Sequence, residues 1–405
     1  MFCTDKYIIA MFSDKKMFAA GMLKNPYNRI ERVLYPDKTD KFANKYLREI
    51  WYDELDYDFA NNYYKKNQYP LALGACSSIC TDNFLARNYD WTLCENVTFV
   101  VHTESKAGRY KTLGVASTDG LTKSVVESGL FSTRYKLLPF CLLDGINEYG
   151  LSASTNVVPV GPNDHGYNII VNPNNPIEVN TMMLVRYLLD NCKNITEVKA
   201  AVNDNLSIYT IKGLLNMGYT QHYIFKDSTG STILEFIDGV PTWHDGATSM
   251  TNFHISSVTF NDDGTVVTPA TRTDDDTKGI TPHASGLERY NIIVSTMTAS
   301  STLENMKSLL NSLNYTNAYK NIGTENTQWY TEFVGLRGLK ATDTEQVFKD
   351  SGILDAAKDA YNKRSRKLGN IWQSTHSSIY DLTDKKLYIR CDEGEFVDEY
   401  TEFNF

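Results

Sequence analysis

Cys76 is the residue whose type and position best suit covalent chemistry. It follows the small residues Gly74 and Ala75 and opens a β-type run that continues to Thr81. If the bond between Ala75 and Cys76 were cut, Cys76 would carry both a thiol and a free α-amino group. An α-amine has a pKa of about 7.7–8.0, so it can accept the thiol proton at neutral pH without a histidine. The pattern therefore predicts a cysteine nucleophile that cleavage of the chain uncovers.

Two charged residues follow Cys76 on the partner strand of the same predicted hairpin. Arg87 and Asp90 come 11 and 14 positions after Cys76 (87−76 and 90−76), beyond an Asp82-Asn83 turn. The carboxylate could hold an ammonium group in place, and the guanidinium could stabilise a thiolate. A plain Arg–Asp ion pair at the end of a hairpin explains the same two residues, and taken alone it is the stronger interpretation.

Histidine, the usual general base, gives no matching signal. The chain has seven histidines, and none lies in a G-x-S-x-G or H-E-x-x-H motif. We interpret most of them as surface or structural residues, although a histidine-dependent triad stays open. The seven cysteines include no C-x2-C pair, so neither a zinc ribbon nor a dense disulfide framework is expected.

Several short motifs, taken in order, resemble a known family. The run Cys-Ser-Ser-Ile at 76–79, followed by Ala-Arg-Asn-Tyr-Asp-Trp at 86–91, resembles the N-terminal-nucleophile hydrolases of the choloylglycine hydrolase and penicillin V acylase family. Acid ceramidase and isopenicillin N acyltransferase are similar, more distant relatives. The remaining motifs follow in the family's order, and they are Asp144–Leu151, Asn156, His222–Asp227, Gly230–Glu235, Met250–Asn252, Ser285–Tyr290 and Ser377–Leu382. The resemblance covers about residues 76–391.

The resemblance implies roles for the cysteine and the charged residues. Cys76 would be the catalytic nucleophile, and self-cleavage of the bond after Ala75 would expose it. Asp90 would orient the new α-amine, and Arg87 and Arg289 would tune the local field around the thiol. No metal or cofactor is required for this chemistry. Outside the resemblance, Cys76 could be one more small buried residue and Arg289 a surface residue at a helix start.

The resemblance also implies roles for two asparagines and two aromatic residues. The side-chain amides of Asn156 and Asn252 would donate to the oxyanion, where loss of one donor typically costs roughly 10²–10³ in rate. Asparagine often occupies turns, so either residue could instead be structural. For Asn156 the structural and catalytic interpretations are about equally supported, and for Asn252 the catalytic one is favoured. Tyr89 and Trp91 would line the substrate pocket.

The sequence departs from the family's pattern at three places. The hairpin between Cys76 and Arg87 is shorter than in typical bile-salt hydrolases. Residues 257–283 form a polar loop without a counterpart. Seventy-five residues precede Cys76, where bile-salt hydrolases lose only an initiator methionine. The long pro-segment is more similar to acid ceramidase and the acyltransferase.

The elements that would position these residues follow from the apolar patterns. Amphipathic helices are expected within 37–69. Strands are expected at 77–81, 84–88, 97–103, 110–116, 138–143, 151–158, 222–226, 232–236, 377–381 and 386–391. Helices are expected at 181–189, 196–202, 287–297 and 303–313. This order indicates an α+β fold with antiparallel sheets. The resemblance implies a four-layer αββα sandwich, with a helical pro-segment at 1–75 that self-cleavage removes and a catalytic domain at 76–405.

Composition excludes several classes of protein. The net charge of −9 and a hydrophobic fraction of 42% indicate a globular protein without a main nucleic-acid partner. No run approaches the roughly 18 apolar residues of a membrane span. The apolar run from Tyr7 to Phe12 is shorter than a signal-peptide core, so we expect a cytoplasmic protein. A homo-oligomer stays open.

Three functions remain in competition at this point. The leading one is a cysteine amidase, made as a zymogen, that hydrolyses a small-molecule linear amide of the N-acyl, bile-salt or penicillin V kind. The second is an acyltransferase on the same scaffold, which passes the acyl group to an amine instead of water. The third is a non-catalytic relative that binds an acyl ligand.

Overall fold

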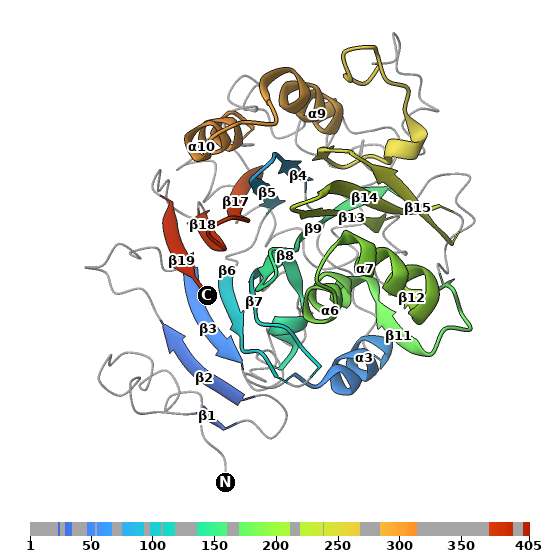
Figure 1. The fold of residues 1–405 in the computed structure, drawn as a ribbon, viewed down its shortest axis with the longest axis vertical. Helices are drawn as coiled ribbons and strands as arrows, with labels where there is room; N and C mark the ends of the chain where they lie inside the picture. Colours follow the sequence, from blue (N-terminus) through green and yellow to red (C-terminus); the bar gives the residue numbers. More distant parts are fainter. Residues whose placement is uncertain are drawn as a thin grey trace, which may run out of the picture.

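The computed structural model describes residues 23–24, 29–34, 47–52, 55–66, 75–92, 98–106, 108–117, 136–159, 170–210, 219–237, 239–267, 284–313, 372–391 and 400–405. These residues form two large β-sheets, a small third sheet and a set of helices (Figure 1).

The larger sheet has ten strands, and nearly all neighbours run antiparallel. Its order is β1 (Leu23–Lys24), β2 (Arg29–Leu34), β3 (Leu47–Tyr52), β6 (Thr98–Thr103), β7 (Thr112–Ser117), β8 (Leu142–Asn147), β9 (Ser152–Pro159), β13 (Tyr219–Asp227), β14 (Gly230–Ile237) and β15 (Val240–Asp245). The exception is the parallel pair of β3 and β6.

The second sheet carries the predicted nucleophile and is antiparallel throughout. Its order is β16 (Ser249–Met250), β4 (Ala75–Cys80), β5 (Phe84–Thr92), β17 (Trp372–Asp381), β18 (Lys386–Cys391) and β19 (Thr401–Asn404). A small sheet of β10 (Ile170–Val171), β12 (Leu206–Tyr209) and β11 (Ile177–Asn180) lies apart from both.

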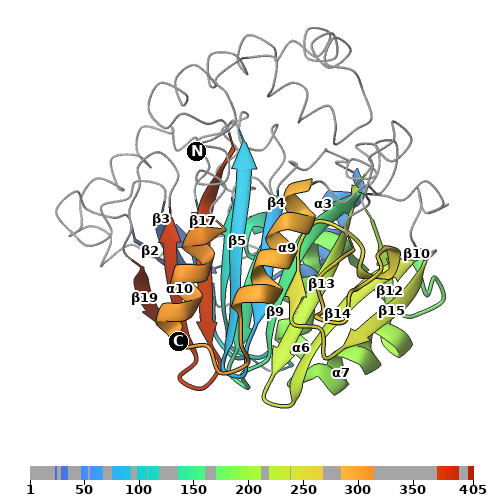
Figure 2. The ribbon, with the colours of Figure 1, turned by 90° about the horizontal axis from the view of Figure 1, so that it is seen from above.

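Helices cover the outer face of each large sheet. On the ten-stranded sheet lie α3 (Tyr57–Lys66), α6 (Leu184–Asn191) and α7 (Ile195–Ala200), whereas α9 (Ala284–Thr296) and α10 (Leu303–Ser312) cover the six-stranded sheet (Figures 1 and 2). Single helical turns occur at Leu138–Phe140, Thr181–Met183, Ala201–Asn205 and Ile255–Ser257. None of the helices in the described ranges is long and apolar enough to cross a membrane.

Three buried clusters fill the spaces between these layers. Leu85, Val100 and Tyr380 belong to the cluster between the two sheets. The six-stranded sheet packs Ile79 and other residues against Leu310 of α10. A third cluster joins the ten-stranded sheet to α3 and α6. The expected α+β fold, a four-layer αββα sandwich, is confirmed.

Gly145 allows α6 to lie close on the ten-stranded sheet. Gly114 of β7 and Gly145 of β8 are directly opposite each other. A Cβ atom on Gly145 would lie 2.8 Å from Leu189 Cδ1 of α6, closer than real Cβ contacts occur. The glycine after Asp144 is therefore required by helix–sheet packing, and β8 keeps Asp144 on the other face, toward the second sheet.

The helices expected within 37–69 are wrong for their central part. Residues 47–52 form strand β3, and among the described residues of this range the helix is limited to 57–66. Leu47, Ile50, Trp51 and Leu55 fit a helical period, but pairing with β6 places Ile50 and Tyr52 in the core, and this tertiary contact overrides the local pattern. Residues 37–46 and 67–69 lie outside the described ranges.

Two smaller differences concern the ends of elements. The strand expected at 138–143 begins at Leu142, because Pro139 belongs to a short helical turn before it. The helix expected from Thr196 begins at Ile195, and its N-cap is Asn194, whose side-chain oxygen accepts from the Glu197 amide at 2.9 Å.

Candidate active site

The hairpin of β4 and β5 sends its side chains alternately to two sides. Cys76 is opposite Tyr89 and Ser78 is opposite Arg87, with a turn at residues 82–83. The Ser78 hydroxyl forms a hydrogen bond with Ser154 of β9 across the interior. The side chains of Cys76, Ser78 and Arg87 therefore face the ten-stranded sheet. Asp90 lies on the opposite face, toward α9. The thiol and the Asp90 carboxylate are therefore on different sides of one sheet.

The Cys76 thiol is buried, with 1% of the residue exposed, and Arg87 Nη2 lies 3.3 Å from its sulfur. Burial raises the pKa of the thiol, while the positive charge of Arg87 works in the opposite direction. The net direction is upward, so the sulfur is a neutral thiol that requires a base before it can attack.

Asp144 holds the guanidinium of Arg87 and is a site residue that the sequence analysis did not single out. Arg87 Nη1 donates to Asp144 Oδ2 at 3.0 Å, and both side chains are buried. Ser378 and Tyr380 of β17 donate to the other carboxylate oxygen. Burial alone would raise the pKa of Asp144, but the nearby His376 ring and the Arg87 charge bring it below its usual value. The available signal was its place at the head of the Asp144–Leu151 motif.

Asn252 contacts the backbone nitrogen of the predicted nucleophile. The Cys76 N–H donates to Asn252 Oδ1 at 2.6 Å, and the same oxygen accepts from Arg289 Nη2 at 2.8 Å. Asn252 Nδ2 donates to the Val157 carbonyl at 2.7 Å. The nitrogen that would become the α-amine is thus held by a side chain that two other elements fix.

Arg289 of α9 connects Asn252 to Asp90. Its Nη1 donates to Asp90 Oδ2 at 3.2 Å and to Ser77 Oγ at 2.7 Å. Ser374 donates to the other oxygen of Asp90. Burial raises the pKa of Asp90 to about 6, although the Arg289 charge opposes this change. Among the contacts of the described residues, Asp90 therefore reaches the Cys76 nitrogen through Arg289 and Asn252.

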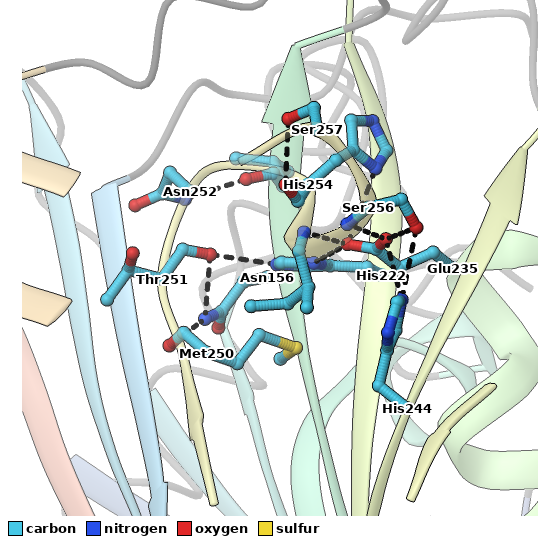
Figure 3. A network of polar contacts seen from close by, with 12 residues as sticks. Asn156, His222, Glu235, His244, Met250, Thr251, Asn252, His254, Ser256 and Ser257 are labelled. Carbon is cyan, nitrogen blue, oxygen red and sulfur yellow. Dashed lines mark hydrogen bonds and ion pairs between the residues drawn. The ribbon is translucent and has the colours of Figure 1, made fainter. Parts of the chain in front are cut away.

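Asn156 of β9 braces the segment that carries Asn252. Its Nδ2 donates to the carbonyl oxygens of Met250 at 3.1 Å and Thr251 at 3.3 Å (Figure 3). Its Oδ1 accepts from Ser78 at 3.1 Å. Both N–H bonds are thus directed to backbone. Its role as an oxyanion donor stays a prediction.

The two predicted pocket residues lie on β5. Tyr89 is 6% exposed, and its ring packs between the Arg87 guanidinium at 4.9 Å and the His376 ring at 5.2 Å. Trp91 is opposite Gln373 of β17, and Ala75 is opposite Asp90; the side chains of Trp91 and Ala75 lie outside the described part. A pocket-lining role for Tyr89 and Trp91 stays a prediction.

Most of the described histidines are buried, which fits the structural alternative and not the surface one. Of the five that the structure describes, His102, His222, His254 and His376 are buried, and His244 is about one-fifth exposed. His165 and His283 lie outside the described ranges. No group of three or more His, Cys, Asp or Glu residues within the described part has the arrangement of a metal site.

Comparisons with known proteins agree with the motif analysis. The family model described as acyl-coenzyme A:6-aminopenicillanic acid acyl-transferase matches residues 79–242, which include Arg87, Asp90 and Asn156. This match confirms, over that range, the resemblance expected from the sequence. Cys76, Asn252 and Arg289 lie outside the matched range. No curated protein sequence matches the chain.

Solved structures of similar proteins include two bacterial hydrolases. A mutant of the conjugated bile acid hydrolase from Clostridium perfringens has a TM-score of 0.44 and 13% identity, covering 82% of this chain and 92% of that one. The penicillin V acylase from Agrobacterium tumefaciens has a TM-score of 0.36 and 15% identity, covering 82% and 86%.

Proposed function

We propose that this chain is a cysteine-nucleophile enzyme that cuts its own Ala75–Cys76 bond and then cleaves a linear amide through an acyl-enzyme. The observation that carries the proposal is that two side chains contact the two reactive atoms of Cys76, its backbone nitrogen and its sulfur. Asn252 binds its backbone nitrogen at 2.6 Å, and Arg87 binds its sulfur at 3.3 Å. Both partners belong to one buried network with Asp90, Arg289 and Asp144.

In the maturation step, the sulfur of Cys76 attacks the carbonyl carbon of Ala75. The bond from that carbon to the Cys76 nitrogen breaks, the nitrogen takes up the thiol proton, and a thioester forms. Water then hydrolyses the thioester, which releases the Ala75 carboxylate and restores the thiol. Asn252 already contacts the departing nitrogen, and Arg87 lies beside the sulfur as it loses its proton.

In turnover, the α-amine of Cys76 accepts the thiol proton and the thiolate attacks a substrate amide. The amine then passes this proton to the leaving nitrogen, and an acyl-thioester remains. Water then attacks the carbonyl carbon of this thioester, and the α-amine takes one of its protons. The carbon–sulfur bond breaks, the acid leaves, and the α-amine returns the proton to the sulfur of Cys76. In this scheme Asn156 and Asn252 donate to the oxyanion, and each would exchange a bond to backbone carbonyl for one to the substrate.

An acyltransferase is the second candidate, and the matching family model favours it. The first half of the reaction is the same, but an amine instead of water attacks the acyl-thioester. The two outcomes differ only in which nucleophile reaches the thioester, so the acyl-enzyme and its residues are common to both.

The segment before Cys76 is better treated as a permanent part of the enzyme than as a piece that leaves. Strand β3 lies inside the ten-stranded sheet, and α3 packs on its outer face. Tyr64 of α3 contacts Cys141 Sγ with its hydroxyl at 2.6 Å. We therefore propose that cleavage yields a molecule of two associated chains, in place of the loss of residues 1–75 that the motif comparison implied.

Mass spectrometry of the purified protein tests the maturation step. We expect a fragment that begins at Cys76, and we expect the Cys76→Ala chain to stay whole. Cys80→Ala is the matched control, because Cys80 is a buried cysteine of the same strand and should leave cleavage intact. An uncut chain in a preparation that turns over an amide would contradict the proposal.

A substrate panel separates hydrolysis from transfer. Penicillin V, glycine-conjugated bile salts and N-acyl amino acids are incubated with the protein, with and without an acceptor amine. Free acid at the same rate in both conditions indicates a hydrolase. A new amide that forms only with the acceptor indicates the transferase. If a chain that has cleaved itself forms neither free acid nor a new amide, the remaining candidate is a non-catalytic relative that binds an acyl ligand.

A further inference from the structure

A fully buried carboxylate lies behind the segment that carries Asn252. Glu235 of β14 accepts from the backbone amides of Ile255 at 2.7 Å and Ser256 at 3.0 Å, and from Ser256 Oγ at 2.7 Å. Three histidine rings surround the same carboxylate, with nitrogen–oxygen distances of 3.4 Å for His222, 3.1 Å for His244 and 3.5 Å for His254 (Figure 3). None of the chemistry proposed above uses this group.

The surroundings of Glu235 are those of an ionised carboxylate used as an anchor. Burial alone would raise its pKa, but the bonds from His222, His244 and His254 outweigh burial and bring the pKa far below its usual value. Each ring directs a nitrogen at the carboxylate, and these four side chains do not form a metal site. The carboxylate therefore acts as a fixed acceptor that several elements share.

His222 transmits this anchor to the active-site segment. Its Nε2 lies 2.8 Å from the Thr251 carbonyl oxygen. A carbonyl can only accept, so Nε2 carries the proton and donates it. The other ring nitrogen, Nδ1, faces Glu235 Oε1 at 3.4 Å. A neutral ring with its proton on Nε2 leaves Nδ1 as an acceptor, so a bond to the ionised Glu235 requires a second proton, on Nδ1. Burial lowers the pKa of His222 and opposes this second proton, as the neighbouring His254 does, whereas the bond to Glu235 and its negative charge favour it.

The Thr251 peptide is fixed from three sides. Its carbonyl accepts from His222 of β13 and from Asn156 of β9. Its hydroxyl donates to the Gly286 carbonyl at the start of α9 at 2.9 Å. The next residue is Asn252, whose side chain holds the Cys76 nitrogen at 2.6 Å. Glu235 also binds the amides of 255 and 256, so one carboxylate restrains both ends of the 251–256 turn.

We propose that Glu235, acting through His222, is a positioning residue that sets Asn252 against the nitrogen of Cys76. The inference rests on the proposed function, since it assigns Glu235 and His222 a role in the same site. Neither side chain touches the reacting atoms. A displacement of about 1 Å in a catalytic group can cost about 100-fold in rate, so the effect appears in kcat and not in substrate binding.

Paired substitutions at His222 separate positioning from packing. His222→Gln keeps an amide N–H near the place of Nε2, whereas His222→Leu fills similar space without a donor. We expect His222→Leu and Glu235→Gln to lower kcat and the rate of self-cleavage by about 10- to 100-fold with KM nearly unchanged, and His222→Gln to recover most of the loss. His102→Gln is the control, because His102 is a buried histidine of β6 that pairs with Glu49 at 2.7 Å and belongs to neither the Glu235 cluster nor the 251–256 segment.

Nitrogen NMR of histidine in the Cys76→Ala chain gives a second readout that needs no activity. A His222 Nε2 proton that exchanges slowly with water is expected, and Glu235→Gln should shift the Nδ1 resonance. Wild-type kcat in folded His222→Leu and Glu235→Gln, or an unprotonated Nε2, would overturn the inference. If the wild type neither cleaves nor turns over while the Nε2 proton is present, the proposed function fails and the anchor stands.

Discussion

Asp144 holds the guanidinium of Arg87 at 3.0 Å, and the same guanidinium donates to the sulfur of Cys76 at 3.3 Å. Asp144 lies on β8 of the ten-stranded sheet, and Arg87 lies on β5 of the six-stranded sheet. The pair therefore crosses the interior of the sandwich and fixes a positive charge beside the predicted nucleophile. Both partners are almost fully buried, so neither can find water if the other is lost.

Asp144→Asn should destabilise the fold strongly. The substitution keeps the shape of the side chain but leaves the buried charge of Arg87 without its counter-ion, which costs about 3–5 kcal/mol of the free energy of unfolding. Urea denaturation of the Cys76→Ala chain measures this without interference from self-cleavage. Glu304→Gln is the control, because Glu304 is an exposed partner of Lys307 and should change stability by less than about 0.5 kcal/mol. Equal stability of wild type and Asp144→Asn would contradict the ion pair.

Asp90 should make stability depend on pH in a definite direction. Burial raises its pKa to about 6 in the folded chain from an ordinary value of 3.8. The folded state therefore binds the proton more tightly than the unfolded state, and the stability from this group is complete below pH of about 4 and lost as pH rises through about 6. We expect the free energy of unfolding of wild type, relative to Asp90→Asn, to fall by about 3 kcal/mol over this range.

Denaturant titrations of both chains at half-unit pH steps check this expectation. The Cys76→Ala background is again used for each chain. Because every other titrating group is common to the pair, the difference between the two curves isolates Asp90. A difference that stays flat from pH 4 to 7 would show that Asp90 has an ordinary pKa in the folded chain.

Much of the candidate site could be predicted because its members sit in local motifs. A turn at residues 82–83 pairs β4 with β5, so Cys76, Arg87 and Asp90 had to be near one another. The order of motifs placed Asn252 and Arg289 in the same site, and the structure brings both to the Cys76–Asp90 region. These inferences depended on short-range pattern and on motif order.

The features that could not be predicted from the sequence depend on contacts between distant strands and between the layers of the sandwich. Asp144 begins a motif that predicts a turn, and nothing in its sequence neighbours shows that β8 crosses over β5. Glu235 and its histidines come from separate strands and a loop, and only the packed sheet brings them together. Strand β3 was assigned to a helix because its partner, β6, begins 46 residues after β3 ends (98−52). Non-local pairing of this kind leaves little trace in a local period.

The chain before Cys76 has extensive contacts with the chain after it. Strand β3 pairs along its whole length with β6, and Ile50 and Tyr52 are fully buried. On the helix-covered face of the same sheet, Tyr57 donates to the Asp190 carboxylate at 2.7 Å. These contacts do not pass through the Ala75–Cys76 bond, so breaking that bond leaves them in place.

We therefore expect the cleaved protein to elute from a native sizing column as one species, at the same volume as the uncut Cys76→Ala chain, and to separate into two bands under denaturing conditions. Ile50→Asp should release the smaller chain, because a charge at this buried position opposes the pairing of β3 with β6. Lys65→Ala is the control, since Lys65 forms an exposed ion pair with Glu178 and should leave the complex intact. A folded, cleaved protein that lacks the smaller chain would contradict the two-chain molecule.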